Sequence, residues 1–391
     1  MQYDFDEVIE RRGTGALKYE ALLPRWGRDD LIPLWVADMD FRTPPFIMEA
    51  IRRRCEHEIL GYTVKPRAFF EAIRDWVDRR HGWKVNASEI GFAPGIVPGI
   101  SSAIQCFTEP GDKIMIQPPV YHPFAMIIRE NGREIVNNPL ILENGRYRMD
   151  FNHMQEAVRG CRMFILCNPH NPAGRVWTRD ELVRLGEICR RNHVTVISDE
   201  IHCELVFPGH TYLPFASISD QHLWNSVTCI SPSKSFNLAG LQIANIIARD
   251  DALRQRIDRA ININEVCDVN PFGVEATIAA YNQGEEWLMQ LLGYLHGNYE
   301  ALCEFFGKYL PQIAVTELEG TYLVWTDCRK LGLSSDVLQS RLLAEAGVWL
   351  NSGTMYGAEG EGFMRWNIAC PRSVLAQAME RFRDFVDSLQ K

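Results

Sequence analysis

The sequence has no segment that marks a membrane protein or a nucleic-acid-binding protein. None of its apolar runs reaches the roughly 20 residues that a membrane-spanning helix needs. Residues 1–6 do not show the basic-then-apolar order of a signal peptide. The net charge is −9, and no basic tract or stripe is present. We therefore expect a cytoplasmic protein whose partners include neither a membrane nor nucleic acid.

Closely spaced cysteine pairs are also missing. The eleven cysteines are dispersed and contain no CxxC pair, which argues against a disulfide framework and against a structural zinc site. His202 and Cys203 are neighbours, but no second pair stands at metal-ligand spacing. We expect reduced, mostly buried thiols and no bound metal.

Internal repeats and low-complexity linkers are absent, and strands and helices alternate instead. A chain of 391 residues, 46% of them hydrophobic and 23% charged, is typical of a soluble globular protein with one large domain and a smaller one. The alternation between residues 88 and 250 predicts an α/β fold, with a mostly parallel mixed sheet between helices. The expected strands are 89–92, 113–116, 133–136, 163–166, 194–197, 226–230 and 245–248. The expected helices there are 98–107, 121–131, 178–192 and 250–262.

The pattern changes after about residue 286. A long helical stretch is followed by a strand at 322–325, a helix near 335–346, a strand at 363–368 and a terminal helix. We predict a large domain over 45–285, and a smaller α+β domain made of 286–391 and the amino-terminal segment 1–44. The large domain is expected to begin with a helix that starts at the prolines of Thr43-Pro44-Pro45 and runs to about Leu60.

Lys234 is the first candidate for chemistry. It follows the predicted strand 226–230, and Ser231, Ser233 and Ser235 surround it. Open α/β sheets bind ligands at the carboxyl ends of their strands, and a lysine there can form a Schiff base with a carbonyl cofactor. The alternative is a solvated surface charge, which is what most lysines are.

Two other strand ends carry groups that could bind a ligand. Gly95, with the amides of Ile96 and Val97, joins a strand to a helix and forms a candidate phosphate site, although an ordinary Gly/Pro turn would look the same. Tyr121 follows the next strand in a proline-rich turn. Its ring could stack on a flat heteroaromatic and its hydroxyl could give a proton, or it could simply pack in the turn.

Further candidates are an amide, an acid and a late arginine. Asn171 lies in a loop with two Asn-Pro pairs, which is either a binding loop or a structural double turn. Asp199 follows the four β-formers 194–197 and one serine, so it should be nearly buried and need a positive partner, unless it caps the next segment. Arg365 lies in an apolar run and could clamp a carboxylate, or lie on an edge strand. Chance assembly of all these features in this order is improbable.

With these motifs in place, the chain resembles the fold-type-I pyridoxal-phosphate enzymes of the aspartate aminotransferase superfamily over nearly its whole length. Within that superfamily it is most similar to the MalY/PatB group of cystathionine β-lyases, or C–S lyases. The stretches that carry the resemblance are 33–41, 61–62, 168–174, 198–202, 231–241, 365–369 and 371–373.

The resemblance implies pyridoxal 5'-phosphate as cofactor, in a large domain of the transferase-like fold, and a role for each candidate. Lys234 would form the Schiff base and act as the catalytic base, and Tyr121 would stack on the ring and serve as a candidate proton donor. Asn171, Asp199 and His202 would lie at the ring. The phosphate would be held by Gly95, Ile96, Val97, Ser231 and Ser233, and by Tyr62 from the other subunit of a homodimer with shared active sites. Arg365, with Asn171 and the backbone at Ala37, would bind the substrate's carboxylate.

Two departures from the aminotransferase pattern favour the lyase group. His202 stands where many aminotransferases have tyrosine, and Gln242 stands where they commonly place a phosphate-binding arginine. The implied reaction is β-elimination from cystathionine or a related small sulfur-containing amino acid, giving a thiol, pyruvate and ammonia. Two alternatives remain open: transamination with the same lysine, and an additional regulatory role through binding of a transcription factor.

Overall fold

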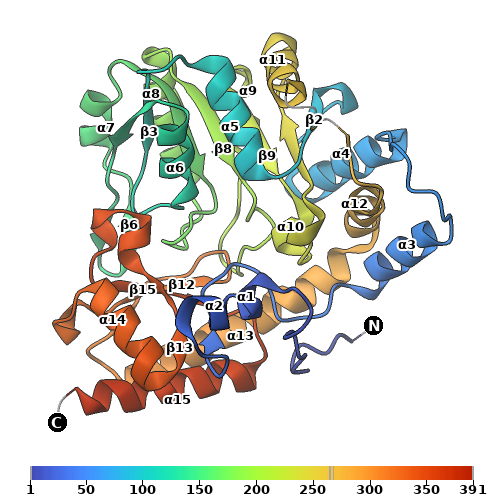
Figure 1. Ribbon diagram of the computed structural model, residues 1–391. Coiled ribbons are helices and arrows are strands. Elements are labelled where there is room, and N and C mark those ends of the chain that lie inside the picture. Colours follow the sequence, from blue (N-terminus) through green and yellow to red (C-terminus); the bar gives the residue numbers. More distant parts are fainter. Residues whose placement is uncertain (1, 264–265, 267, 390–391) are drawn as a thin grey trace.

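A seven-stranded sheet forms the centre of the computed structural model, which describes residues 2–263, 266 and 268–389. The strands follow the order β2-β10-β9-β8-β7-β3-β4 (Figure 1). All neighbouring pairs are parallel except those that β10 makes with β2 and β9. The strand bounds are β2 Ile90–Ala93, β3 Lys113–Ile116, β4 Glu134–Asn137, β7 Cys161–Cys167, β8 Thr195–Asp199, β9 Ser226–Ile230 and β10 Ala244–Ile247.

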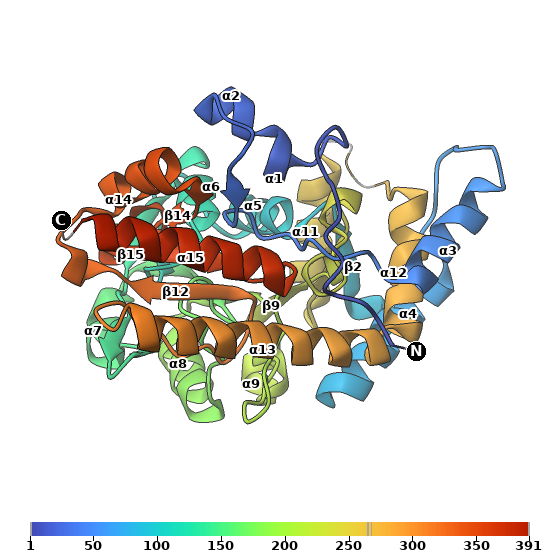
Figure 2. The same ribbon diagram turned by 90° about the horizontal axis from the view of Figure 1, so that it is seen from below.

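Helices cover both faces of this sheet because its strands are apolar on both sides. Along β7, Met163 and Ile165 pack in one buried cluster while Phe164 and Leu166 pack in another, as the two-residue period of a strand requires. Helices α5 (Ile96–Phe107), α6 (Pro123–Glu130) and α11 (Asp251–Asn262) cover one face. Helices α7 (Phe151–Ala157), α8 (Arg179–Arg191) and α9 (Asp220–Trp224) cover the other (Figures 1 and 2).

A second, four-stranded sheet lies beside the first and is antiparallel, with the order β11-β12-β15-β14. Its strands are β11 Ala314–Val315, β12 Leu323–Asp327, β14 Asn351–Ser352 and β15 Phe363–Asn367, and the helices beside it are α13 Glu285–Tyr309, α14 Ser335–Arg341 and α15 Arg372–Ser388. Short strand β1 (Ile32–Pro33) pairs in parallel with β13 (Val348–Trp349) and ties the amino-terminal segment, with α1 (Leu17–Glu20) and α2 (Leu22–Trp26), to this part. β5 (Ile141–Glu143) and β6 (Arg146–Arg148) form a separate two-stranded antiparallel sheet.

The predicted strands and the α/β class are confirmed, with strand ends that move by a few residues at most. The helix expected up to Leu60 is wrong in length, because α3 covers only Pro45–Cys55. Ile59 and Leu60 are 70% and 63% exposed, so no packed face extends that helix. The helix expected near 335–346 is α14 followed by a π-helical turn at Leu342–Ala346. The limits of the two domains stay a prediction. Residues 1 and 391, the outer limits of the predicted small domain, lie outside the described residues.

The two longest described helices that were not predicted are α4 (Arg67–His81) and α12 (Pro271–Gln283). In α4, the apolar residues Phe69, Ile73, Trp76 and Val77 recur at helical spacing and are all buried, so periodicity could have identified it. In the described part of the chain, no helix is long and apolar enough to cross a membrane.

The strand directions decide where the polar groups meet. β3, β7, β8 and β9 run parallel to one another. β2 has the same direction, because it is antiparallel to β10, which is itself antiparallel to β9. The carboxyl ends of all five strands therefore lie at one edge of the sheet, which is where such sheets bind ligands.

Candidate active site

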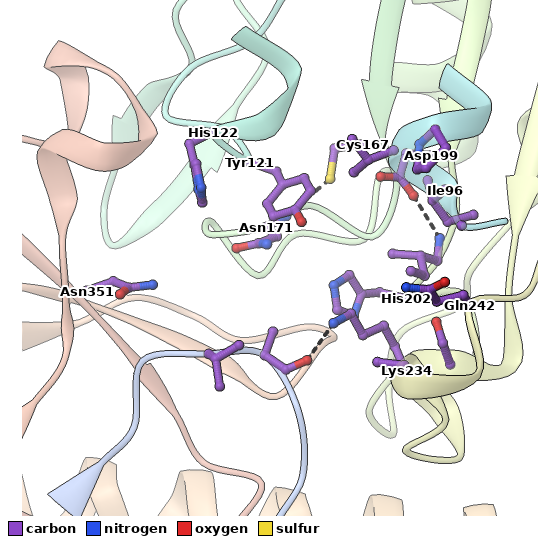
Figure 3. A pocket seen from close by; sticks show the side chains of 18 of the residues that line it. Ile96, Tyr121, His122, Cys167, Asn171, Asp199, His202, Lys234, Gln242 and Asn351 are labelled. Atoms are coloured by element: carbon purple, nitrogen blue, oxygen red, sulfur yellow. Dashed lines mark hydrogen bonds between the residues drawn. The ribbon is translucent and has the colours of Figure 1, made fainter. Parts of the chain in front are cut away.

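A cavity of about 430 Å³ opens at this edge of the sheet. Its lining includes nearly all of the site residues predicted from the sequence, and Figure 3 shows several of them around the same space. They are Ala37, Gly95, Ile96, Val97, Tyr121, Asn171, Asp199, His202, Ser233, Lys234 and Arg365. Ser231 and Tyr62 are the two predicted site residues that do not line it.

Lys234 faces the cavity from the short helix α10 (Pro232–Ser235), directly after β9. Its Nζ donates a hydrogen bond of 2.5 Å to the carbonyl oxygen of Ala37. Burial lowers the pKa of this amine to about 8, although the nearby Asp38 partly opposes the shift. A lysine with this pKa is neutral in an appreciable fraction of molecules near pH 7, which is what a nucleophile or base requires.

The carbonyl that receives Lys234 belongs to a firmly held segment. Tyr322 also donates to the oxygen of Ala37, at 3.0 Å. Asn367 donates from Nδ2 to the carbonyl oxygens of Val36 and Asp38, at 2.6 Å each. Tyr322 and Asn367 were not predicted as site residues, because only the packing of the second sheet brings them to this segment.

Asp199 ends β8 as an almost fully buried acid. It is 3% exposed, and its carboxylate accepts a hydrogen bond of 3.1 Å from the amide of Ile201. No cationic side chain pairs with it among the described residues. Burial raises its pKa to about 7, and a buried carboxylate without a counter-charge favours a positive partner from outside the chain.

His202 is buried beside the lysine and is neutral. Burial, with the positive charges of Lys234 and Arg365, lowers its pKa to about 3. Its Nδ1 is buried without a hydrogen-bond partner in the described structure. The ring meets Tyr322 edge-on at 5.9 Å between centroids. A neutral imidazole here can give or accept a hydrogen bond but adds no charge.

The start of α5 is suited to an anion. Gly95 has a φ of +139°, a backbone conformation that side chains disfavour. No side chain caps the helix that begins at Ile96, so its first amides remain free for a ligand. Ser233 lines the cavity nearby, as does Gln242. The predicted Ser231 acts indirectly, since its Oγ accepts from the Ser233 amide at 3.0 Å and caps α10.

Arg365 stands on β15 and is 3% exposed. Its Nη1 donates to Oδ1 of Asn171 at 3.2 Å, and its Nη2 donates to the carbonyl oxygen of Trp35. Its Nε is buried without a partner, and no carboxylate of the described chain pairs with it. The guanidinium is therefore held in place with donor capacity left for a carboxylate ligand.

Tyr121 lies between β3 and α6 and turns its ring to the cavity (Figure 3). Burial, helped by the negative charge of Asp199, raises its pKa to about 12. The hydroxyl therefore keeps its proton at neutral pH and can donate it.

Several lining residues had not been identified from the sequence. They come from segments that tertiary packing brings to the cavity: Arg25, Trp35, Pro94, His122, Cys167, Asn351 and Met355. Three of them had a sequence signal: Trp35 lies within the stretch 33–41, and Pro94 and His122 are next to the predicted Gly95 and Tyr121. Tyr62, by contrast, is 99% exposed on the segment between α3 and α4 and lies outside the cavity lining.

A second buried polar cluster joins α4 to the turn after β8. His81, Cys203 and Glu204 lie close enough to hold a metal ion. However, Glu204 already accepts from Trp76 Nε1 at 2.6 Å and contacts His81 Nε2 at 2.8 Å and Arg80 Nε at 3.2 Å. These contacts satisfy the acid within the chain, so the cluster is a structural link.

Comparisons with known proteins agree over nearly the whole chain. Residues 29–382 match the family described as aminotransferase class I and II. Cystathionine beta-lyase PatB of Bacillus subtilis (strain 168) is 43% identical over 97% of this chain and 99% of its own. Protein MalY of Escherichia coli (strain K12) is 32% identical over 96% and 97%.

Solved structures are also similar to this chain over nearly its whole length. Cystalysin from Treponema denticola, which contains a pyridoxal 5'-phosphate cofactor, superposes with a TM-score of 0.97 at 32% identity and full coverage of both chains. The PLP-bound C–S lyase from Staphylococcus hominis has a TM-score of 0.92 at 35% identity, covering 99% of this chain and 98% of its own. The backbone framework around the cavity is thus shared with cofactor-bound enzymes.

Proposed function

Since the chain belongs to the aminotransferase class I and II family, we propose that it is a pyridoxal-phosphate-dependent C–S β-lyase. It removes the sulfur substituent of cystathionine or a related cysteine S-conjugate, giving a thiol, pyruvate and ammonia. The observation that carries this proposal is Lys234 in one cavity with the buried, unpaired Asp199, in a chain 43% identical to a cystathionine β-lyase.

The cavity residues fit the cofactor. The free amides at the start of α5, with Ser233, suit its phosphate. Asp199 suits a protonated ring nitrogen, because a positive partner removes the cost of its buried charge. Asn171 would hold the ring's oxygen, and Tyr121 would stack on the ring. Gln242 is uncharged and stands where aminotransferases commonly have a phosphate-binding arginine. The amides at the start of α5 therefore contribute more of the phosphate binding in this chain.

Bound pyridoxal phosphate supplies an aldehyde for a Schiff base with an amine and a ring that accepts electrons from the substrate's Cα. Arg365 binds the substrate's α-carboxylate and so fixes the direction of the Cα–H bond. Lys234 takes the Cα proton on Nζ. Tyr121 donates its hydroxyl proton to the departing sulfur. His202 stays neutral and adds no competing positive charge beside Lys234.

The assay that tests this function supplies cystathionine to the cofactor-loaded protein without any keto acid. We expect stoichiometric release of a thiol and pyruvate, because elimination needs no second substrate. Transamination is the alternative, and it consumes a keto acid in every cycle. Turnover only when a keto acid is added would overturn the lyase proposal.

Cofactor capture should depend on pH through Lys234. A pKa lowered from 10.5 to about 8 leaves about a tenth of the amines neutral at pH 7. Asp199, with a pKa of about 7, loses its negative charge as the pH falls further. Protonation of Lys234 and of Asp199 therefore both lower the rate of cofactor capture at acidic pH. We expect the rate at which cofactor-free protein captures pyridoxal phosphate to rise with pH and level off above about 8, measured by absorbance after mixing.

The control for this profile is Lys234→Ala, which removes the amine and should abolish the dependence near pH 8. A flat profile for the unmodified protein, or a midpoint near 10.5, would contradict the assignment of the capturing amine.

We further propose that the protein is a homodimer in which Tyr62 reaches the partner's cavity. The exposed apolar side chains Ile59, Leu60, Tyr62 and Val64 lie together on the segment between α3 and α4, with exposed fractions from 63% to 99%. A contiguous apolar segment of this kind marks a protein contact.

Tyr62→Phe tests this arrangement by removing only the hydroxyl. Loss of a hydrogen bond to the charged phosphate, of about 1.5–3 kcal/mol, should weaken cofactor binding by about ten- to 150-fold in an equilibrium titration. Tyr309→Phe, at another exposed tyrosine, is the matched control and should bind as tightly as the unmodified protein. Unchanged binding in Tyr62→Phe, or a monomer in sedimentation, would contradict the shared site.

We propose that the enzyme is cytoplasmic. The ten described cysteines are all free thiols, which suits a reducing compartment; Cys267 lies outside the described residues. No feature of the described surface favours the additional regulatory role, which remains a prediction from the resemblance.

A further inference from the structure

Arg25 lines the cavity and is exposed to solvent, so it lies where the cavity opens. It comes from α2, in the amino-terminal segment, and its guanidinium lies over the ring of Trp35 at 5.0 Å and over that of Trp349 at 5.8 Å. These two indoles are stacked on each other, with centroids 4.2 Å apart and an interplanar angle of 13°. Stacking on a rigid aromatic pair orients an arginine without using its hydrogen-bond donors.

Arg25 also has no acidic partner within the described chain. Its neighbours in sequence do: Arg12 pairs with Glu10 and Arg28 with Asp30. Among the described residues, the guanidinium of Arg25 makes cation–π contacts with Trp35 and Trp349. Its donors therefore face solvent and the cavity, free for an anion.

The cavity lining carries more positive than negative side chains. The cations are Arg25, Lys234 and Arg365, and the acid is Asp199. In the proposed function Asp199 serves the cofactor, Lys234 moves the proton and Arg365 binds the α-carboxylate. Arg25 is the cation that this scheme leaves without a partner.

Trp35 connects the two arginines. Its carbonyl oxygen accepts from Arg365, and its ring carries Arg25. Both guanidiniums therefore contact the same tryptophan, Arg365 at its carbonyl oxygen and Arg25 at its ring. His122 lines the same cavity (Figure 3), and its buried Nδ1 has no partner in the described structure. It offers a further polar contact.

From these contacts we propose that Arg25 binds a negatively charged group at the far end of the sulfur substituent, so that the enzyme prefers cysteine S-conjugates with an anionic leaving portion. This inference rests on the proposed β-lyase function. Arg25 is then a specificity-determining residue that touches the distal end of the substrate, away from the bonds that break.

The test compares two substrates that differ in the distal charge, S-(2-carboxyethyl)cysteine and S-propylcysteine. In the unmodified protein the carboxyethyl substrate should have the higher kcat/KM. Arg25→Gln should lower kcat/KM for the carboxyethyl substrate by about tenfold, the size expected of one charge-assisted contact at a partly exposed site, and leave the propyl substrate within about twofold. Arg25→Lys should retain part of the preference, and added salt should reduce it.

A binding measurement makes the test independent of turnover. Thiodipropionate and 3-(propylthio)propanoate mimic the two substrates but lack the amino group, so they bind without reacting. We expect Arg25→Gln to weaken binding of the dicarboxylate alone by about tenfold, measured by calorimetry. Arg12→Gln, which removes an exposed arginine outside the cavity lining, is the matched control and should change neither ligand.

The outcomes separate the two proposals. Absence of pyruvate from both substrates in the unmodified protein overturns the β-lyase function, while the calorimetric comparison still tests Arg25. The role of Arg25 is overturned, even when elimination is confirmed, by either of two results for Arg25→Gln. One is an equal loss of kcat/KM for both substrates and of affinity for both ligands. The other is no change in kcat/KM or in affinity.

Discussion

Lys234→Ala should abolish elimination, with a loss of kcat/KM of at least about 10³-fold. Lys234 is the cavity amine whose pKa is lowered to about 8, and in the proposed function it is both the anchor of the cofactor and the base for the Cα proton. General base catalysis alone contributes about 10²–10⁴-fold, and the covalent anchor is lost as well. Pyruvate release from cystathionine measures the effect.

Two controls make this result specific. Lys308→Ala removes a lysine on α13, outside the cavity lining, and should retain full activity. Added methylamine should restore part of the activity of Lys234→Ala, because a small amine can take the proton from the space that the side chain leaves. Full activity of Lys234→Ala, or borohydride fixing the cofactor to a different lysine, would contradict the assignment.

Asp199→Asn should lower kcat/KM by about 10²–10⁴-fold. Asparagine keeps the size of the side chain but removes the buried charge that would pair with the ring nitrogen. Breaking a buried pair by removing one partner costs about 3–5 kcal/mol, and each 1.36 kcal/mol in the barrier is tenfold in rate. Exchange of the substrate's Cα proton with deuterated water should slow to a similar extent.

Asp258→Asn is the matched control for this variant. Asp258 is also an acid whose pKa burial raises, but it does not line the active-site cavity. It should leave turnover and exchange unchanged. If Asp199→Asn exchanges the Cα proton as fast as the unmodified protein, Asp199 does not support proton removal, and its burial needs another explanation.

Most strands of the large sheet were predictable because each is centred on a short run of apolar and β-branched residues. The run 194–197, which precedes Ser198 and Asp199, contains only β-formers, and such strands are buried on both faces in parallel sheets. The candidate residues were predictable as a group for the same reason, since the ends of parallel strands meet at one edge. Helix α4 was not predicted, although its buried apolar residues recur at helical spacing and were visible in the sequence.

Other features could not be predicted from local sequence. The hydrogen bonds from Tyr322 and Asn367 to the segment at Ala37 join residues 285 and more positions apart. The position of Arg25 depends on the pairing of β1 with β13 and on the stack of Trp35 with Trp349. Contacts between such distant segments leave no periodic signal in the sequence.

The sequence by itself determined the strands of the large sheet, the edge at which the polar residues gather, and the resemblance from which their roles were inferred. These follow from periodicity and motif spacing, which are local properties of the chain. The tertiary structure decided the ionisation of Lys234, Asp199 and His202, because desolvation shifts a pKa only once the surrounding chain has excluded water. It also decided that Arg25 stands at the cavity mouth without an acidic partner, because charge pairing is settled by which surfaces pack together.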